Sequence, residues 1–167
     1  MELIKSRYGD HPDFDRILES LDMLSHQTEE ELQAEKKILS CYGEHLDKVC
    51  AVLNTLTTEQ IAERCAELKS DLFSTSMAFF SSISEQLTRF LKRVKMRLRG
   101  LSADIKVHLL NYMRDWWIEK IYPVIQYFID KIDAVAKLLG VDSYSVSLNY
   151  AFITVGFTFK STLKKWL

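Results

Sequence analysis

The chain has 167 residues, of which 47% are hydrophobic and 27% are charged, and its formal net charge is −1. This length is typical of one domain that buries its own core, and the composition excludes a disordered chain. Because the chain is not basic overall and carries no recognised binding motif, we do not expect nucleic acid as a partner.

The cysteines and the start of the chain bear on where the protein works. Cys41, Cys50 and Cys65 are odd in number and have no CxxC spacing, which favours thiols in a reducing compartment. The first fifteen residues have neither the apolar run of a signal peptide nor an Arg-rich transit pattern. We therefore expect a cytoplasmic protein, either free or associated with a membrane.

Two helices are predicted in the first third of the chain. Asp10, followed by Pro12 and Asp13, predicts a helix start with a capping side chain and a proline in the first turn, and a short amphipathic run over residues 14–24 follows. Thr28 and Glu31 then form a capping-box pattern, which predicts the start of a second helix that ends near residue 53.

A third, much longer helix is predicted from Thr57, which forms a capping-box pattern with Gln60, to Gly100. Its length of about 60 Å requires either an elongated molecule or a break. We expect a break or bend in the serine-rich stretch 74–82, because hydroxyl groups compete for backbone hydrogen bonds. One stripe of this helix comprises Ile61, Cys65, Leu68, Leu72, Ser76, Phe79, Ile83, Leu87, Phe90, Val94 and Leu98.

A fourth helix is predicted from Ser102 to Gly140, with Pro123 expected to kink or split it. Residues 144–159 carry no charge. Apolar side chains occupy every second position up to Phe152, and again every second position, in the opposite phase, from Ile153. A strand here would need a bulge and a partner strand. Since no second strand-like run is evident, we favour a helix that is buried or inserted in a membrane.

These patterns predict an all-α fold. Residues 1–143 are expected to form an elongated antiparallel helical bundle of four to five helices, in which the third is either broken or continuous. Residues 144–167 are expected to form a hydrophobic C-terminal segment with a basic and aromatic end, either part of the same domain or a membrane anchor.

A basic run over residues 89–99 is the sharpest local feature. Basic amphipathic helices bind anionic membranes or acidic partners. Alternatively, a hairpin about Thr57 would place this run opposite residues 15–29, where Glu19, Asp22, Glu29 and the acids that follow them lie, so that Arg93 and Arg97 pair inside the fold. The basic residues are Arg89, Lys92, Arg93, Lys95, Arg97 and Arg99.

Neighbouring tryptophans, Trp116 and Trp117, point about 100° apart on a helix, so at most one can lie at the centre of the core. The other would lie near a rim, where it suits a membrane interface or a partner surface. Motifs of catalysis are absent, and we expect no enzyme activity, no cofactor and no metal. Cys41 and His45, one turn apart, supply too few ligands for a metal site.

The order of features over residues 110–167 resembles that of the Bcl-2 family, whose members often finish with a membrane anchor. Here a tryptophan-bearing helix is followed by an uncharged segment and a Lys-Lys-Trp end. The family's NWGR signature is absent. Ser70 also stands where its BH3 pattern has an aspartate, so the resemblance does not establish membership.

The sequence favours a non-enzymatic helical-bundle protein that associates with a membrane or a membrane-bound assembly through its C-terminal segment. The alternative is a soluble interaction or scaffold protein with a protein partner or a second copy of itself, whose C-terminal segment is the core helix. The expected membrane or partner contacts are Arg89, Lys92, Arg93, Arg97, Trp116, Trp117, Phe152, Phe157, Lys164, Lys165 and Trp166.

Overall fold

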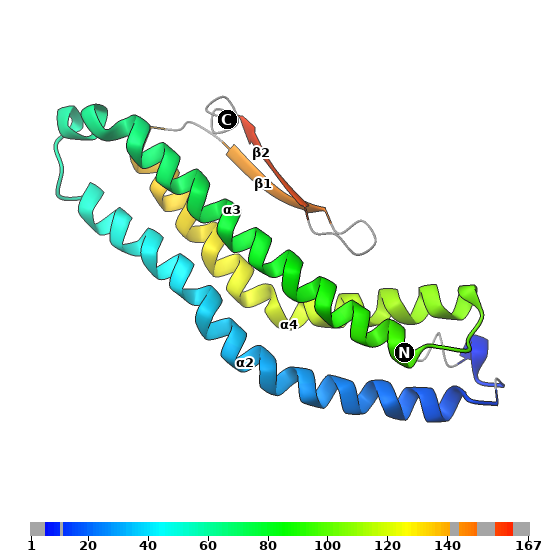
Figure 1. Cartoon of the computed structure of the whole chain (residues 1–167). Helices are drawn as coiled ribbons and strands as arrows, with labels where there is room; N and C mark the ends of the chain where they lie inside the picture. Colours follow the sequence, from blue (N-terminus) through cyan, green and yellow to red (C-terminus); the bar gives the residue numbers. More distant parts are fainter. Residues whose placement is uncertain (1–5, 11, 141–143, 150–155, 162–167) are drawn as a thin grey trace.

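The computed structural model describes residues 6–10, 12–140, 144–149 and 156–161. Within these residues three long helices contact one another pairwise, and Figure 1 shows them as an elongated, curved, antiparallel bundle. The predicted helical bundle is confirmed. The elements are α2 (Phe14–Leu53), α3 (Thr58–Arg97), α4 (Ala103–Leu138), β1 (Tyr144–Asn149) and β2 (Gly156–Ser161).

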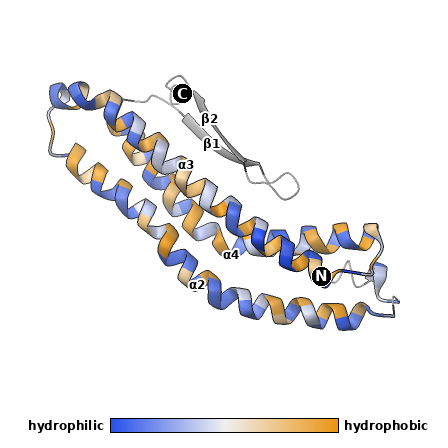
Figure 2. Cartoon of the chain, viewed as in Figure 1, coloured by the Kyte–Doolittle hydropathy of each residue, from blue (hydrophilic) through white to orange (hydrophobic). Residues whose placement is uncertain are grey.

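Each helix is amphipathic, and Figure 2 shows apolar and polar positions alternating along all three. Their apolar stripes meet in a single core that runs the length of the bundle. The largest fully buried side chains include Trp117, Phe79, Phe80 and Phe128. Because the core is long and narrow, the molecule is elongated. Of the two alternatives for the third helix, an elongated molecule or a break, the first is found.

The first two predicted helices are one continuous helix, α2, so the prediction of a separate helix starting at Thr28 is wrong. Thr28 lies on the buried stripe between Leu24 and Leu32 and is only 3% exposed. Its Oγ1 donates a hydrogen bond to the carbonyl oxygen of Leu24 at 2.7 Å, within its own helix. Burial of this face satisfies the hydroxyl inside the helix, and no cap forms.

The predicted break in the third helix is also wrong, since α3 is continuous across residues 74–82. Ser76 is fully buried, and its Oγ donates to the carbonyl oxygen of Leu72 at 2.7 Å. A hydroxyl that bonds back to the preceding turn occupies the carbonyl without displacing the helical hydrogen bond. Packing against α2 and α4 then supports the full length of α3.

Both ends of α3 follow the predicted signals. The Thr57 side chain accepts a hydrogen bond from the Gln60 backbone N–H at 3.2 Å, and the Gln60 side chain accepts one from the Thr57 N–H at 2.9 Å. Gly100 has φ +89°, the left-handed conformation expected where the chain leaves the helix. The buried stripe runs from Leu72 to Leu98, whereas Ile61 and the positions near it are only half-buried.

Pro123 does not split α4, which continues through it to Leu138. Figure 1 shows the helix bending near its middle, in agreement with the predicted kink. Pro123 itself is exposed, so its ring occupies the solvent side of the bend.

The C-terminal segment is not a helix in the structure, and the helix prediction is corrected here. β1 and β2 pair as an antiparallel hairpin in which Val146 lies opposite Phe159 and Leu148 opposite Phe157. The partner strand that seemed missing is thus the other half of the same segment, and the change of phase at residues 152–153 falls between the two strands. Residues 150–155 and 162–167 lie outside the described part of the chain.

β2 contacts α3, and Figure 1 shows the hairpin lying beside that helix. Among the described residues, no helix is both long enough and apolar enough to span a bilayer.

Candidate functional site

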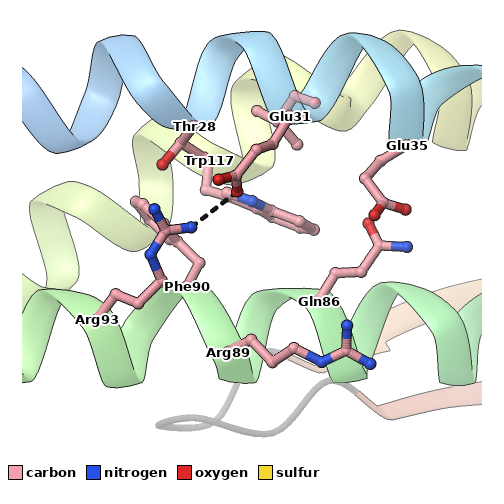
Figure 3. Close-up of a pocket in the computed structure, with 9 residues that line it drawn as sticks. Thr28, Glu31, Glu35, Gln86, Arg89, Phe90, Arg93 and Trp117 are labelled. Atoms are coloured by element: carbon pink, nitrogen blue, oxygen red, sulfur yellow. Dashed lines mark hydrogen bonds and ion pairs between the residues drawn. The ribbon is translucent and has the colours of Figure 1, made fainter.

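A groove between α2 and α3 brings together three residues that the sequence singled out, Arg89, Arg93 and Trp117 (Figure 3). Its volume is about 160 Å³. The remaining lining residues are Thr28, Glu31, Leu32, Glu35, Gln86 and Phe90.

The floor of this groove is apolar and aromatic. Trp117 from α4 is 1% exposed and Phe90 from α3 is 3% exposed. Trp116 is half-buried, with its ring centroid 5.8 Å from that of Phe90 and 5.9 Å from the Lys120 Nζ. The prediction that one tryptophan enters the core while its neighbour lies near a rim is confirmed.

The walls carry acids from α2 and bases from α3. The Arg93 Nη1 lies 2.7 Å from the Glu31 Oε2 and bridges the two walls. Arg89 instead lies 3.6 Å from Glu85, on its own helix. The predicted internal pairing of the basic run therefore holds for Arg93, whose partner Glu31 is one of the acids that follow Glu29.

Gln86 presents an unusual polar atom at this groove. Its Nε2 donates to the Ser82 Oγ at 3.1 Å, while its Oε1 is buried and has no hydrogen-bond partner in the described structure. Figure 3 shows this oxygen and the Glu35 carboxylate pointing toward one another. With its amide turned by 180°, Gln86 would instead donate its Nε2 to the Glu35 carboxylate and accept from the Ser82 hydroxyl, so the two side chains can satisfy each other.

The second feature, called the basic face of α3 here, comprises Lys92, Lys95 and Arg97 of the helix and Arg99 of the turn that follows it. Arg97 is half-buried and the other three are exposed. No ion pair joins any of them to an acid within the described ranges, so the predicted pairing of Arg97 with the acids of α2 is wrong. Met96 lies among them with 61% of its surface exposed.

Two ion pairs join α2 to α4, and each shifts the pKa of one of its members. The Lys120 Nζ lies 3.0 Å from the Glu29 Oε1, and its hydrogen bond and charge lower the pKa of Glu29. The Lys131 Nζ donates to the Asp47 Oδ1 at 2.8 Å, and this hydrogen bond raises the pKa of Lys131. These pairs hold α4 against α2.

A polar cluster attaches the chain before α2 to the start of α4. The Tyr8 hydroxyl donates to an Asp104 carboxylate oxygen. Burial and this hydrogen bond raise the pKa of Tyr8, while the same hydrogen bond lowers the pKa of Asp104.

Cys41 and His45 do not converge on a common ligand. The His45 Nε2 lies 2.9 Å from the Asp71 Oδ2, and the Cys41 thiol donates to the Lys37 carbonyl oxygen at 3.4 Å. The described ranges contain no group of three or more His, Cys, Asp or Glu side chains placed to hold a metal ion.

The other predicted contacts are in the C-terminal segment. Phe157 is a residue of β2, in register with Leu148. Phe152, Lys164, Lys165 and Trp166 lie outside the described residues.

Among the six groove residues that sequence reasoning missed are Thr28, Glu35 and Gln86. A signal was present for the first two, since Thr28 and Glu35 fall on the helical repeat that includes Leu24, Leu32 and Leu39. A polar residue on an apolar stripe marks a position where the core is interrupted. Gln86 carried no comparable signal, because its place at the groove depends on how α3 aligns with α2.

Comparison of the chain with protein-family models, with curated proteins and with solved structures gave no match.

Proposed function

We propose that this protein is a non-enzymatic helical bundle that binds an anionic membrane surface through the basic face of α3 together with the C-terminal segment. The observation that carries the proposal is the set of basic side chains on α3 that have no acidic partner in the described structure. β2 contacts the same helix, with the hairpin beside the middle of α3 and the basic face at the end of that helix (Figure 1).

Electrostatic attraction supplies part of the affinity. A basic side chain near an anionic surface contributes about 1 kcal/mol, and this attraction weakens with salt. Met96 adds an exposed apolar side chain within the basic face. Stable association with a membrane generally needs two such signals, one electrostatic and one apolar.

We propose that the C-terminal segment supplies the apolar contribution to membrane association. Residues 144–159 carry no charge, and Lys160 and Lys164 follow directly. A two-stranded hairpin cannot span the hydrocarbon core with its edges unpaired, so the proposal is peripheral contact.

Co-sedimentation with vesicles tests the basic face. Full-length protein is expected to sediment with vesicles of phosphatidylserine and phosphatidylcholine at low salt, and less so with phosphatidylcholine alone. The double variant Lys92→Gln, Lys95→Gln should lose most of this binding. A matched control, Lys37→Gln with Lys48→Gln on α2, changes the net charge equally and should bind as the parent does. Equal binding of the two double variants would contradict the proposal.

The contribution of the C-terminal segment needs a second variant. Phe157→Asp places a charge in β2, and the cost of burying it in an interface is expected to weaken vesicle binding. The helical bundle should retain its melting temperature, which circular dichroism measures.

A further inference from the structure

The first turns of α3 lack the third helix of the bundle. Phe79 of α3 stacks on Phe128 of α4, and the two helices are antiparallel (Figure 1). Equal counts from this pair along both helices place the last residue of α4 level with Lys69 of α3. Residues 58–68 of α3 therefore extend past the end of α4, and they are called the open tip.

The apolar stripe of α3 continues into the open tip but is not buried there. The stripe positions from Leu72 to Leu98 are all buried, whereas Ile61, Cys65 and Leu68 are only half-buried. A helix in a three-helix bundle buries its stripe between two neighbours. Since α2 can cover the stripe from one side only, the side that α4 would occupy is left open.

Acidic side chains flank this uncovered part of the stripe. No ion pair joins Glu59, Glu63 or Glu67 to a base in the described part of the chain. Arg64 and Lys69 are the bases of the same stretch, and Lys69 already interacts with another residue. An occupant of the open tip therefore needs apolar side chains for the stripe, with positive charge beside them.

Residues 162–167 follow β2 at the end of the hairpin that lies near the open tip. Tyr144, which pairs with Ser161, is only four residues beyond Gly140. Four residues span at most about 14 Å, so Ser161 lies within about 20 Å of the end of α4. Because β2 is antiparallel to β1, it runs back toward that end (Figure 1). Six further residues extend over about 20 Å, enough to reach the open tip.

We propose that residues 162–167 of this chain bind the open tip. Their sequence is Thr-Leu-Lys-Lys-Trp-Leu, and the apolar positions 163, 166 and 167 share one side of a helical turn. Trp166 supplies a large apolar surface that covers Cys65 and its neighbours on the stripe. Lys164 and Lys165 flank that side, where the acids of the open tip attract them.

A segment of the same chain has an advantage over a separate partner. Its effective concentration near the open tip is in the millimolar range, so a contact surface of a few side chains is sufficient for binding. While residues 162–167 occupy the tip, Trp166 and the two lysines beside it cannot contact a membrane. This consequence rests on the proposed function, whereas the docking itself does not.

Alkylation of Cys65 by iodoacetamide, followed by peptide mass spectrometry, tests the docking. Trp166→Ala should uncover the stripe and raise the alkylation rate of Cys65 about tenfold. Cys41, exposed on α2 outside the open tip, should react at the same rate in both proteins. Met96→Ala removes an exposed apolar side chain at the other end of α3 and should leave Cys65 unchanged. Equal Cys65 rates in the parent and in Trp166→Ala would overturn the proposal.

An exchange of charges tests how the segment is placed. Lys164→Glu with Lys165→Glu should raise the Cys65 rate about two- to fivefold, because the acids of the open tip then repel the segment. Adding Glu63→Lys and Glu67→Lys to this variant should restore the rate of the parent. A rate that stays raised in the fourfold variant would contradict the placement of the lysines beside these acids.

Dilution distinguishes the protein's own segment from that of a second copy. The Cys65 rate of the parent should be independent of protein concentration over about a hundredfold range. A rate that rises on dilution would assign the open tip to residues 162–167 of another copy and overturn the intramolecular assignment. Because no vesicle is present, these results are independent of the proposed membrane binding.

Discussion

Two neighbouring layers of the core are packed in opposite ways. In the phenylalanine layer, Phe79 of α3 and Phe128 of α4 stack with ring centroids 3.9 Å apart, and Phe80 meets Phe128 edge to face at 5.8 Å. α2 comes close to this layer at Gly43, where an added Cβ would lie 2.3 Å from a carbon of the Tyr127 ring. Aromatic rings opposite a glycine thus give close packing.

In the groove layer, the same three helices leave a cavity of about 160 Å³. Trp117 is buried there as fully as the phenylalanines are, but Glu35 and Gln86 occupy the adjacent positions of α2 and α3. Their polar groups need solvent or a ligand, and the helices do not close over them. The comparison teaches that polar side chains at stripe positions, rather than a shortage of aromatic residues, open this bundle.

The largest effect is expected in the phenylalanine layer. Phe128→Ala removes a fully buried ring that touches both Phe79 and Phe80, and should lower the free energy of unfolding by about 3–5 kcal/mol. Urea denaturation measures this change. A loss below about 1 kcal/mol would mean that the layer is not closely packed.

Gly43→Ala should also destabilise the bundle. In an exposed helix this substitution is favourable by about 1 kcal/mol, but here the new methyl group meets the Tyr127 ring and should cost about 1–3 kcal/mol. Tyr127→Ala in the same background removes the ring and should restore the ordinary preference for alanine, which a double-mutant cycle detects. Additive effects of the two substitutions would argue against the close approach.

Gln86→Leu should act in the opposite direction in the groove layer. Leucine removes the unsatisfied Oε1 and covers part of the apolar floor, so we expect stabilisation by about 1 kcal/mol. Thermal unfolding of this variant beside the parent checks the sign. Destabilisation would show that the amide already has a partner in the folded state.

The dependence of stability on pH should differ between the ion pairs near the two layers. Glu29, beside the groove layer, has a lowered pKa in the folded state. Its contribution to stability is therefore present above its ordinary pKa of 4.5 and is lost as the pH falls through the lower pKa of the folded state. Lys131 packs on Tyr127 and has a raised pKa in the folded state. Its contribution to stability is therefore present below pH 10.5, its ordinary pKa, and is lost as the pH rises through the higher pKa of the folded state.

Melting temperatures across this pH range test the prediction. Lys120→Gln should reduce the decline in acid, because it removes the partner of Glu29, and should leave the alkaline decline unchanged. Asp47→Asn should do the reverse through Lys131. If either variant altered the acid decline and the alkaline decline in melting temperature equally, each decline could not be assigned to one ion pair.

Local signals predicted the parts of the fold that depend on neighbouring residues. The Thr57 and Gln60 capping box and the left-handed Gly100 need only a few residues of chain, and both were found as predicted. Thr28 has an equally good capping pattern, but its place on a buried stripe decided its conformation. Packing of the whole bundle therefore overrode one of two equivalent local signals.

Features that depend on the alignment of distant segments could not be predicted from the sequence. The alternation of residues 144–159 was visible, but the pairing of β1 with β2 was not. The groove depends on Glu35 and Gln86 coming together from different helices, and Arg97, unlike Arg93, has no acidic partner in the described structure. Which residues of two long helices lie opposite each other is set by side-chain packing along their whole length.

The central claim is that the basic face of α3 serves an external anionic surface. Two single variants, Arg93→Glu and Arg97→Glu, test it most directly when the melting temperature and vesicle binding of each are measured together. Arg93→Glu should lower the melting temperature modestly, since it breaks the Glu31 pair and exposed pairs contribute about 0.2–1 kcal/mol. Arg97→Glu should leave the melting temperature unchanged and weaken binding to phosphatidylserine vesicles. A lowered melting temperature with undiminished vesicle binding in Arg97→Glu would contradict the account.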